Sequence, residues 1–144
     1  MRLGDITGAG IPVYGNADFR GKCPREDMEQ ITFFNWVRRE YPGTWGKLAL
    51  HPRNEGLREK GQFSSVIKHA AEGMTKGASD IVIPARISFV CELKRQDHTQ
   101  SFLAAEQVAY LVSARAAGAF AILALGANGA REGFREWLTV QHQA

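Results

Sequence analysis

Two short apolar runs joined by a tight loop constrain the fold of this chain more than any other feature. The first, DIVI, begins at Asp80, and the second, ISFVCELK, ends at Lys94, with Pro84 to Arg86 between them. Apolar runs bounded by turn-forming residues predict a β-hairpin. A loop of three residues centred on Arg86 would place Asp80 directly across from Glu92, with Cβ atoms roughly 4.5 to 5.5 Å apart.

The charged residues of this hairpin are expected to converge. Side chains alternate between the two faces of a strand, so Glu92 and Lys94 share one face. Two carboxylates this close repel each other unless something compensates them, and Mg²⁺ suits one or two carboxylates while keeping waters that a phosphate can replace. With Lys94 positioning or helping to deprotonate a water, the pattern predicts metal-assisted phosphodiester hydrolysis. From the spacing alone, a solvated surface hairpin in which Asp80 caps a turn is the alternative.

Length and composition indicate one globular domain. The chain has 144 residues, of which 44% are hydrophobic and 23% charged, close to the averages for soluble domains. The longest apolar run, GAFAILALGA, is much shorter than the roughly 20 residues of a membrane-spanning helix, so no membrane partner is expected. The N-terminus has no secretory signal, and Cys23 and Cys91 have no metal-ligand spacing. A reduced, cytoplasmic setting is therefore expected.

The distribution of charge is more informative than its sum. The formal net charge is +3, but residues 47–95 hold nine Lys or Arg against five acids. If two of those acids bind a metal, the region becomes electropositive and suits a phosphate backbone. Solvated basic side chains on exposed faces are the alternative interpretation.

The order of predicted elements indicates an α/β fold. Residues 1–24 form an irregular N-terminal arm, and residues 25–144 form a single domain with a mixed central sheet of about four strands flanked by helices. The predicted elements are a helix over 25–40, a strand over 47–52, a short helix over 64–72, the hairpin, a helix over 101–117, a buried strand over 119–125 and a helix over 130–140.

Apolar spacing predicts which helix faces meet the core. Ile31, Phe34 and Val37 or Arg38 mark the core stripe of the first helix, and Phe102, Ala105, Val108 and Val112 mark that of the helix after the hairpin. The segment GANGAREG, 126–133, is predicted to be a strand-to-helix turn, since it lacks the spacing of a known phosphate loop. A phosphate-binding turn in an α/β small-molecule enzyme is the alternative.

These motifs, taken together, resemble the PD-(D/E)XK nuclease superfamily and, within it, the small stand-alone VRR-NUC-type endonucleases common in phages and prophages. The resemblance covers residues 25–126 and rests on EQ at Glu29 and Gln30, HPRNEG at 51–56, GASDIVIP at 77–84, ELK at 92–94, and Gln107 with Tyr110. It implies a restriction-endonuclease-like fold and dependence on Mg²⁺ or Mn²⁺.

The resemblance also assigns roles at the hairpin. Asp80 and Glu92 match the metal-binding acids, with the backbone carbonyl of Leu93 as a third metal ligand. Lys94 matches the lysine that handles the attacking water. Ser79 departs from the pattern, because a proline often precedes the aspartate in the superfamily.

Further roles fall outside the hairpin. Glu29 matches an acid of the first helix that reaches the metal directly or through water, and Gln107 matches a glutamine that helps to orient the site. His51, Arg53 and Asn54 match a polar, DNA-contacting motif near the cleaved phosphate.

We therefore expect a metal-dependent DNA endonuclease. Arg53, Lys76 and Arg95 are the candidates for a clamp on the DNA backbone, which would make binding salt-dependent. Because no base-reading module is recognisable, cleavage of branched, flapped or junction DNA, as in repair or recombination, is expected rather than sequence-specific cutting. The resemblance implies a homodimer in a bacterial or phage-infected cell. A non-catalytic DNA-binding or assembly protein on the same scaffold is the alternative.

Overall fold

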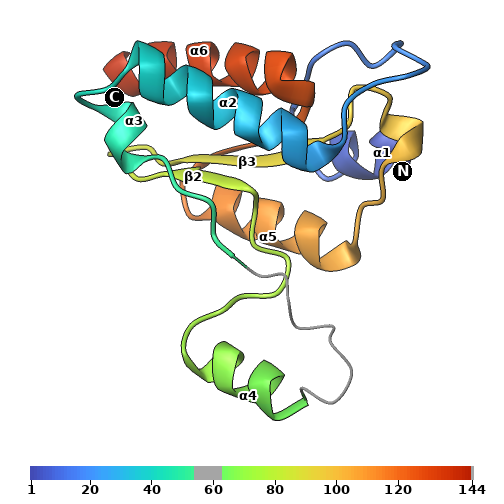
Figure 1. Ribbon diagram of the computed structural model, residues 1–144, viewed down its shortest axis with the longest axis vertical. Helices are drawn as coiled ribbons and strands as arrows, with labels where there is room; N and C mark the ends of the chain where they lie inside the picture. The colour runs from blue at the N-terminus through green and yellow to red at the C-terminus, as the bar shows by residue number, and fades with distance from the viewer. Residues whose placement is uncertain (54–62, 144) are drawn as a thin grey trace.

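Helices cover both faces of one central sheet in the computed structural model, which describes residues 1–53 and 63–143 (Figure 1). The elements are α1 (Leu3–Thr7), β1 (Val13–Tyr14), α2 (Glu26–Glu40), α3 (Trp45–Leu48), α4 (Phe63–Ala71), β2 (Ile81–Ile83), β3 (Phe89–Lys94), a 3₁₀ turn (His98–Gln100), α5 (Ala105–Ala116), β4 (Phe120–Leu125) and α6 (Gly126–Gln143). The predicted α/β class is confirmed.

The sheet is mixed, as predicted, and has four strands in the order β1-β4-β3-β2. β2 and β3 form the antiparallel hairpin with Ile81 opposite Cys91, and β3 runs parallel to β4 with α5 as the crossover. The hairpin loop extends over residues 84–88 and is longer than predicted, but it is centred on Arg86. The predicted register is therefore confirmed.

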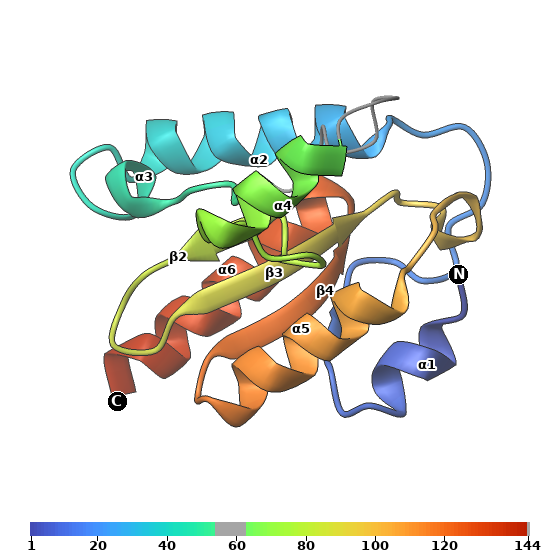
Figure 2. The ribbon, with the colours of Figure 1, turned by 90° about the horizontal axis from the view of Figure 1, so that it is seen from below.

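Each face of the sheet has its own hydrophobic core. Aromatic and aliphatic side chains of α2, α3 and α6 pack on the face that carries Phe89, Cys91 and Leu93. Smaller apolar side chains of α1 and α5 pack on the opposite face, around Val90 and Leu123. Figure 2 shows the α5 side, with α5 running alongside β4. Because side chains alternate, Glu92 and Lys94 belong to the α5 side.

The first 24 residues are not irregular throughout, since they contain α1 and β1. Gly10 and Gly15, both with positive φ, flank a segment in which β1 pairs in parallel with β4, Val13 opposite Leu123. Ile6 of α1 and Ile11 are almost fully buried in the core on the α5 side. The predicted arm therefore contributes an edge strand and part of a core.

The long helix after this segment has the predicted bounds but a rotated core face. Phe33, Trp36 and Val37 are buried together with Phe34, whereas Ile31 is 51% exposed and Arg38 is exposed. Phe33 lies near Phe89 and Phe134, with ring centroids 6.4 and 6.2 Å apart. The packing of these rings determines which face of α2 meets the sheet, and the apolar spacing of the sequence did not predict that face.

The strand predicted over 47–52 does not form: its first two residues are helical and only one of the others makes a bridge. α3 covers its start, and only Leu50 makes a β-bridge, antiparallel to Val82. A tertiary contact explains the difference. Trp45 packs edge-on against Trp137 of α6, with ring centroids 4.9 Å apart, and this contact holds the start of the segment as a helical turn.

The helices predicted after residue 60 are present, but they begin or end at different residues than predicted. α4 lies where a short helix was predicted and projects from the body in Figure 1. α5 begins at Ala105 instead of Ser101. Ser101 lies outside the helix because its hydroxyl accepts a hydrogen bond from Arg95 N and donates one to Glu26. Phe102 is consequently 79% exposed and Val112 41% exposed, so the predicted stripe is wrong at both positions, and Leu111 faces the core instead.

The segment 126–133 is helix, not a turn, since α6 begins at Gly126. Its glycines serve close packing: a Cβ at Gly129 would lie 2.6 Å from the carbonyl oxygen of Tyr14, and one at Gly126 would clash with Glu29 Oε2. The first turn of α6 is thus occupied by the protein itself, which removes the basis for a phosphate-binding turn. Over the residues that the structure describes, no helix has the length and apolarity required to cross a membrane.

Candidate active site

Asp80 and Glu92, here called the acid pair, meet where the hairpin begins. Ile81 pairs with Cys91, and the residue before β2 therefore lies opposite Glu92. Asp80 Oδ2 accepts a hydrogen bond of 2.8 Å from the backbone N–H of Leu93, which fixes its carboxyl group beside β3. The two carboxyl groups are close enough that each affects the pKa of the other. The structure thus brings together the two acids that the sequence predicted as metal ligands.

Burial makes this pair electrostatically unusual. Glu92 is only 1% exposed, whereas Asp80 is partly exposed. Removal from water raises the pKa of Glu92 well above its ordinary value, and the neighbouring Asp80 charge raises it further. Burial also raises the pKa of Asp80, against the opposing effect of the Leu93 hydrogen bond. Without a cation the pair therefore holds a proton to higher pH than an ordinary carboxyl group.

Lys94 and Gln107 complete the site on the α5 side. The Lys94 ammonium donates to the carbonyl oxygen of Phe102 at 2.6 Å and to Gln107 Oε1 at 3.3 Å, and lies 3.5 Å from Glu92 Oε1. Gln107 Nε2 donates to Glu92 Oε1 at 2.8 Å. Gln107 Oε1 also accepts from the N–H of Ala104 at the start of α5. This amide therefore holds both the glutamate and the lysine in place.

One oxygen of the site lacks a fixed donor. Glu92 Oε2 is buried, and among the described residues no N–H or O–H group reaches it. With the Asp80 carboxyl nearby, this oxygen can be satisfied by a shared proton or by a cation. In the described part of the chain no three Asp, Glu, His or Cys side chains gather as a metal site. Two carboxylates alone suit Mg²⁺, which keeps several waters, so the acid pair could hold such an ion.

His51 lies at the outer edge of the acid pair. Its Nδ1 is 2.7 Å from the backbone oxygen of Asp80, and its charge lowers the pKa of the Asp80 carboxyl as a minor contribution. Arg53 is exposed. Asn54, the last residue of the predicted polar motif, lies outside the described residues.

The other predicted basic contacts are engaged elsewhere. Lys76 pairs with Glu106 at 3.0 Å on the surface. The Arg95 guanidinium donates to the carbonyl oxygen of Cys23 at 2.7 Å and so ties the segment before α2 to the end of β3. Lys76 and Arg95 thus have partners within the protein, and the clamp of Arg53, Lys76 and Arg95 on the DNA backbone stays a prediction.

Glu29 is also not brought to the acid pair. Its Oε2 accepts from the N–H of Ala127 at 2.5 Å and its Oε1 from Gln96 Nε2 at 3.3 Å, so it caps the start of α6. The acid of α2 whose charge affects Glu92 is Glu26, one turn earlier, whose Oε1 accepts from the Ser101 hydroxyl at 2.9 Å. The sequence analysis did not select Glu26, and its spacing of one helical turn from Glu29 was the available signal.

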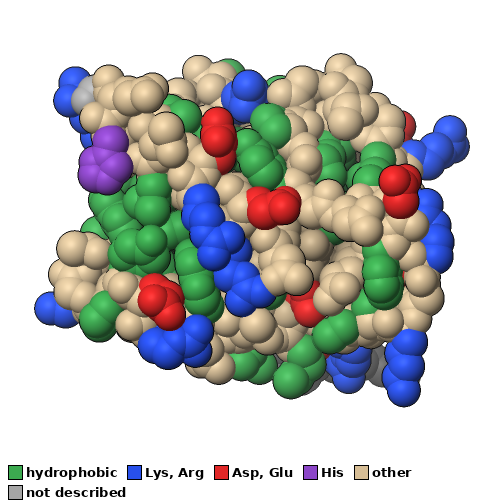
Figure 3. All heavy atoms as spheres, turned by 90° about the horizontal axis from the view of Figure 1, so that it is seen from above, with side chains coloured by type: hydrophobic (Ala, Val, Ile, Leu, Met, Phe, Trp, Pro, Cys, Tyr) green, Lys and Arg blue, Asp and Glu red, His purple; other side chains and the backbone are tan. Residues whose placement is uncertain are grey.

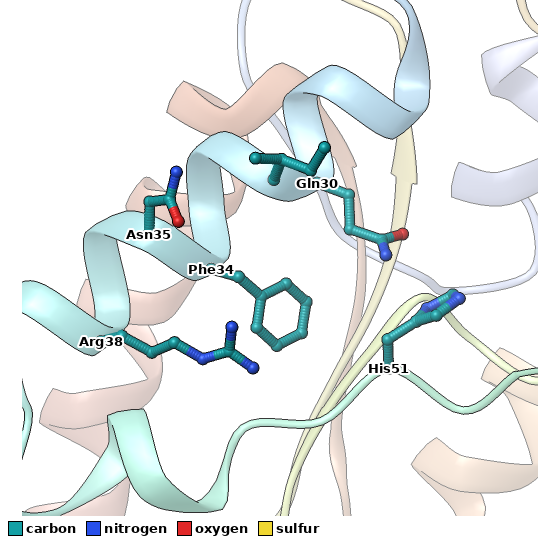
Figure 4. Close-up of a pocket in the computed structure, with 6 residues that line it drawn as sticks. Gln30, Phe34, Asn35, Arg38 and His51 are labelled. Atoms are coloured by element: carbon teal, nitrogen blue, oxygen red, sulfur yellow. The ribbon is translucent and has the colours of Figure 1, made fainter.

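A hollow of about 240 Å³ lies between α2 and the segment that carries His51 (Figure 4). This hollow, here called the α2 hollow, is lined by Gln30, Ile31, Phe34, Asn35, Arg38 and His51. The Arg38 guanidinium lies over the Phe34 ring, 5.1 Å from its centroid. On the α2 and α6 side, basic and acidic side chains are interspersed (Figure 3), so charge alone does not mark this side as a DNA-binding surface.

Comparison with solved structures finds the same fold in a chain described as a VRR_NUC domain protein. The two agree with a TM-score of 0.67 over 83% of this chain and 92% of that chain, at 17% sequence identity. No family model matches the sequence, and no curated protein matches it. At this identity the likeness establishes the fold, so the restriction-endonuclease-like architecture expected from the resemblance is confirmed.

Proposed function

We propose that this protein is a metal-dependent DNA endonuclease that hydrolyses phosphodiester bonds. The observation that carries the proposal is the convergence of Asp80, Glu92, Lys94 and Gln107 at one point of a VRR_NUC fold. A buried pair of like charges is costly, and such a pair supports a functional assignment when a cation can relieve it.

The acid pair supplies the ligands for Mg²⁺ or Mn²⁺. Two groups suit this role best: Glu92 Oε2, which meets no fixed donor among the described residues, and the carboxyl group of the partly exposed Asp80. The Leu93 carbonyl oxygen is the third proposed ligand. When bound, a divalent cation would polarise a phosphate oxygen and lower the pKa of a coordinated water. Asp80 is the partly exposed member of the pair, whereas Glu92 is buried.

Lys94 orients the attacking water. Its ammonium is held by three acceptors, and the contact with Glu92, at 3.5 Å, is the longest of them. A water or phosphate oxygen entering the site would replace that contact while Phe102 and Gln107 keep the ammonium in position. Preorganised charge of this kind stabilises the negative charge that develops on the phosphate in the transition state.

The substrate that fits best is branched, flapped or junction DNA. Nothing in the chain resembles a module that reads base sequence, and the hairpin site is built from groups that act on a phosphodiester bond. His51, which lies beside Asp80, is proposed to contact the DNA backbone next to the cleaved bond. Arg53 is exposed and is proposed to add a salt-dependent phosphate contact.

The test measures cleavage of supercoiled plasmid and of labelled duplex, flap and junction DNA with Mg²⁺ or Mn²⁺, with and without EDTA. Cleavage is expected only with the metal and is expected to be abolished in Asp80→Ala and Lys94→Ala. Lys47→Ala is the matched control, because Lys47 is an exposed lysine of α3.

Full cleavage by folded Asp80→Ala or Lys94→Ala protein would refute the proposal. Tight DNA binding without metal-dependent cutting of any substrate would instead favour a non-catalytic DNA-binding or assembly protein on the same fold. Circular dichroism and thermal melting of each variant would show whether a loss of activity reflects a loss of folding.

A further inference from the structure

We propose that the α2 hollow binds one unpaired nucleobase of the DNA substrate, stacked on the guanidinium group of Arg38. This inference rests on the proposed nuclease function and extends it, because it names the feature of the DNA that the protein would select. The hollow is formed by side chains that the proposed chemistry does not use, apart from His51, which belongs to both sites.

The lining follows from two rows of α2. Gln30, Phe34 and Arg38 are spaced by four residues and form the row nearest His51, as Figure 4 shows. Ile31 and Asn35 form the adjacent row. Residues four apart lie one above the other on a helix, so a planar group can contact several of them at once. The volume of about 240 Å³ is below the range of about 300 to 1,000 Å³ typical for drug-sized ligands, which favours a single ring system.

Arg38 offers a planar, charged platform. Its guanidinium group lies 5.1 Å above the centroid of the Phe34 ring, and Phe34 is only 7% exposed. This contact between the cation and the ring helps to hold the guanidinium group at the hollow. In the described part of the chain no carboxylate pairs with Arg38. A guanidinium plane of this kind is a common stacking partner for an unstacked base.

Two amides provide groups that could bond to the edge of a base. No hydrogen bond involves the side chain of Gln30 or Asn35 among the described residues. Each amide carries donors and an acceptor, which is the pattern that pairs with base edges. A phosphate would be favoured by several converging cations, whereas this hollow has one arginine, one histidine, two amides and the apolar side chains of Ile31 and Phe34. The chemistry therefore favours a base over a phosphate.

His51 links the hollow to the acid pair. Its ring lines the hollow, and its Nδ1 contacts the backbone oxygen of Asp80 at 2.7 Å. A strand whose phosphate lies at the acid pair would therefore place a neighbouring nucleotide at the hollow. A paired, stacked base cannot reach a site of this shape. Substrates with an unpaired nucleotide near the cut, such as flaps and gaps, should be preferred for this reason.

The experiment is a scan with single abasic sites. Binding of flap DNA is measured without metal in a Lys94→Ala background, where no cleavage occurs, and the missing base is moved one position at a time along the unpaired strand. We expect the affinity to fall about tenfold when the base at one position is missing, as expected for the loss of one stacked base. In the same background with Arg38→Ala added, that position should no longer differ from its neighbours.

Two variants separate stacking from charge. Arg38→Lys keeps the positive charge but loses the planar group, so we expect it to behave like Arg38→Ala. Arg135→Ala is the matched control, because Arg135 lies over the Trp36 ring at 5.6 Å but does not line the hollow. It should retain the position-specific penalty.

The outcomes distinguish this inference from the proposed function. A uniform response to abasic sites, or wild-type behaviour of Arg38→Lys, would overturn the base site even if the protein cleaves DNA. A penalty at one position that depends on Arg38 would support the base site even if no substrate is cut. Absence of any DNA binding would overturn the base site as well.

Discussion

Two buried glutamates, Glu29 and Glu92, differ in how their oxygens are satisfied. They are 5% and 1% exposed. Glu29 accepts hydrogen bonds from Ala127 and Gln96, one at each carboxylate oxygen. Glu92 accepts from Gln107 at Oε1, but no N–H or O–H donor among the described residues reaches its Oε2, and it has Asp80 as a close acidic neighbour.

The difference separates a structural carboxylate from one suited to a ligand. A buried acid whose acceptors are all satisfied stabilises the elements that it joins, here α2 and the first turn of α6. A buried acid with an unsatisfied oxygen and a like-charged neighbour is costly until a proton or cation arrives. The two glutamates are therefore alike in burial, and the missing donor together with the neighbouring Asp80 marks the acid pair.

The largest effect is expected from neutralising the acid pair. Glu92→Gln and Asp80→Asn keep the size of the side chain but remove the charge that would hold a cation. We expect each to lower the cleavage rate by at least about a hundredfold, comparable to removing one group that stabilises a transition state. Rates on flap DNA with saturating Mg²⁺ measure this. Wild-type cleavage by either variant would remove the distinction between Glu92 and Glu29.

A smaller effect is expected from Gln107→Ala. The Gln107 amide holds Glu92 and Lys94 without being a proposed metal ligand, and supporting residues of this kind typically contribute about 10- to 100-fold. The Mg²⁺ concentration for half-maximal activity should also rise, because the Glu92 carboxylate is no longer oriented. An unchanged Mg²⁺ requirement would show that Gln107 has only a structural role.

Glu29→Ala should affect stability rather than chemistry. It leaves the Ala127 N–H without its acceptor in a buried position, which should lower the free energy of unfolding by about 1 to 3 kcal/mol. Urea denaturation measures this loss. Cleavage per folded molecule at 20 °C should remain close to wild type. Loss of cleavage without loss of stability would instead support the role of a metal-site acid that the resemblance implied for Glu29.

Local patterns predicted the central hairpin well. A loop centre at Arg86 determines every pairing along an antiparallel hairpin, and a shift by one residue would have moved Glu92 to the other face. The alternation that places Glu92 and Lys94 together is equally local. Gln107, by contrast, was selected through the resemblance, and the structure places its amide against both side chains.

Features that depend on tertiary packing were not predictable in the same way. β1 is two residues long and exists because β4 offers an edge on which it can pair. Trp45 could not be assigned to a helical turn before its contact with Trp137 was known. Whether Glu26 or Glu29 approaches the acid pair depends on the rotation of α2 on the sheet, which is decided by aromatic packing around Phe33.

The smallest expected effect concerns pH and metal together. The pKa values of Asp80 and Glu92 are raised above the ordinary 3.8 and 4.5, so the stability gained by holding a proton is present at low pH and is lost as pH rises through the raised values. If Mg²⁺ binds the deprotonated pair, as proposed, it should raise the melting temperature more at pH 8 than at pH 5, by roughly 4 °C for each kcal/mol of binding free energy.

Glu92→Gln isolates the contribution of the pair to this pH dependence. The variant carries no charge at position 92, so in the absence of metal it should be more stable than wild type at pH 8 and nearly equal to it at pH 4. Glu29→Gln is the matched control, since it changes a buried glutamate that lies outside the acid pair. An equal Mg²⁺ effect on wild type and Glu92→Gln would place the cation elsewhere, and the unsatisfied oxygen of Glu92 would then have no metal to explain it.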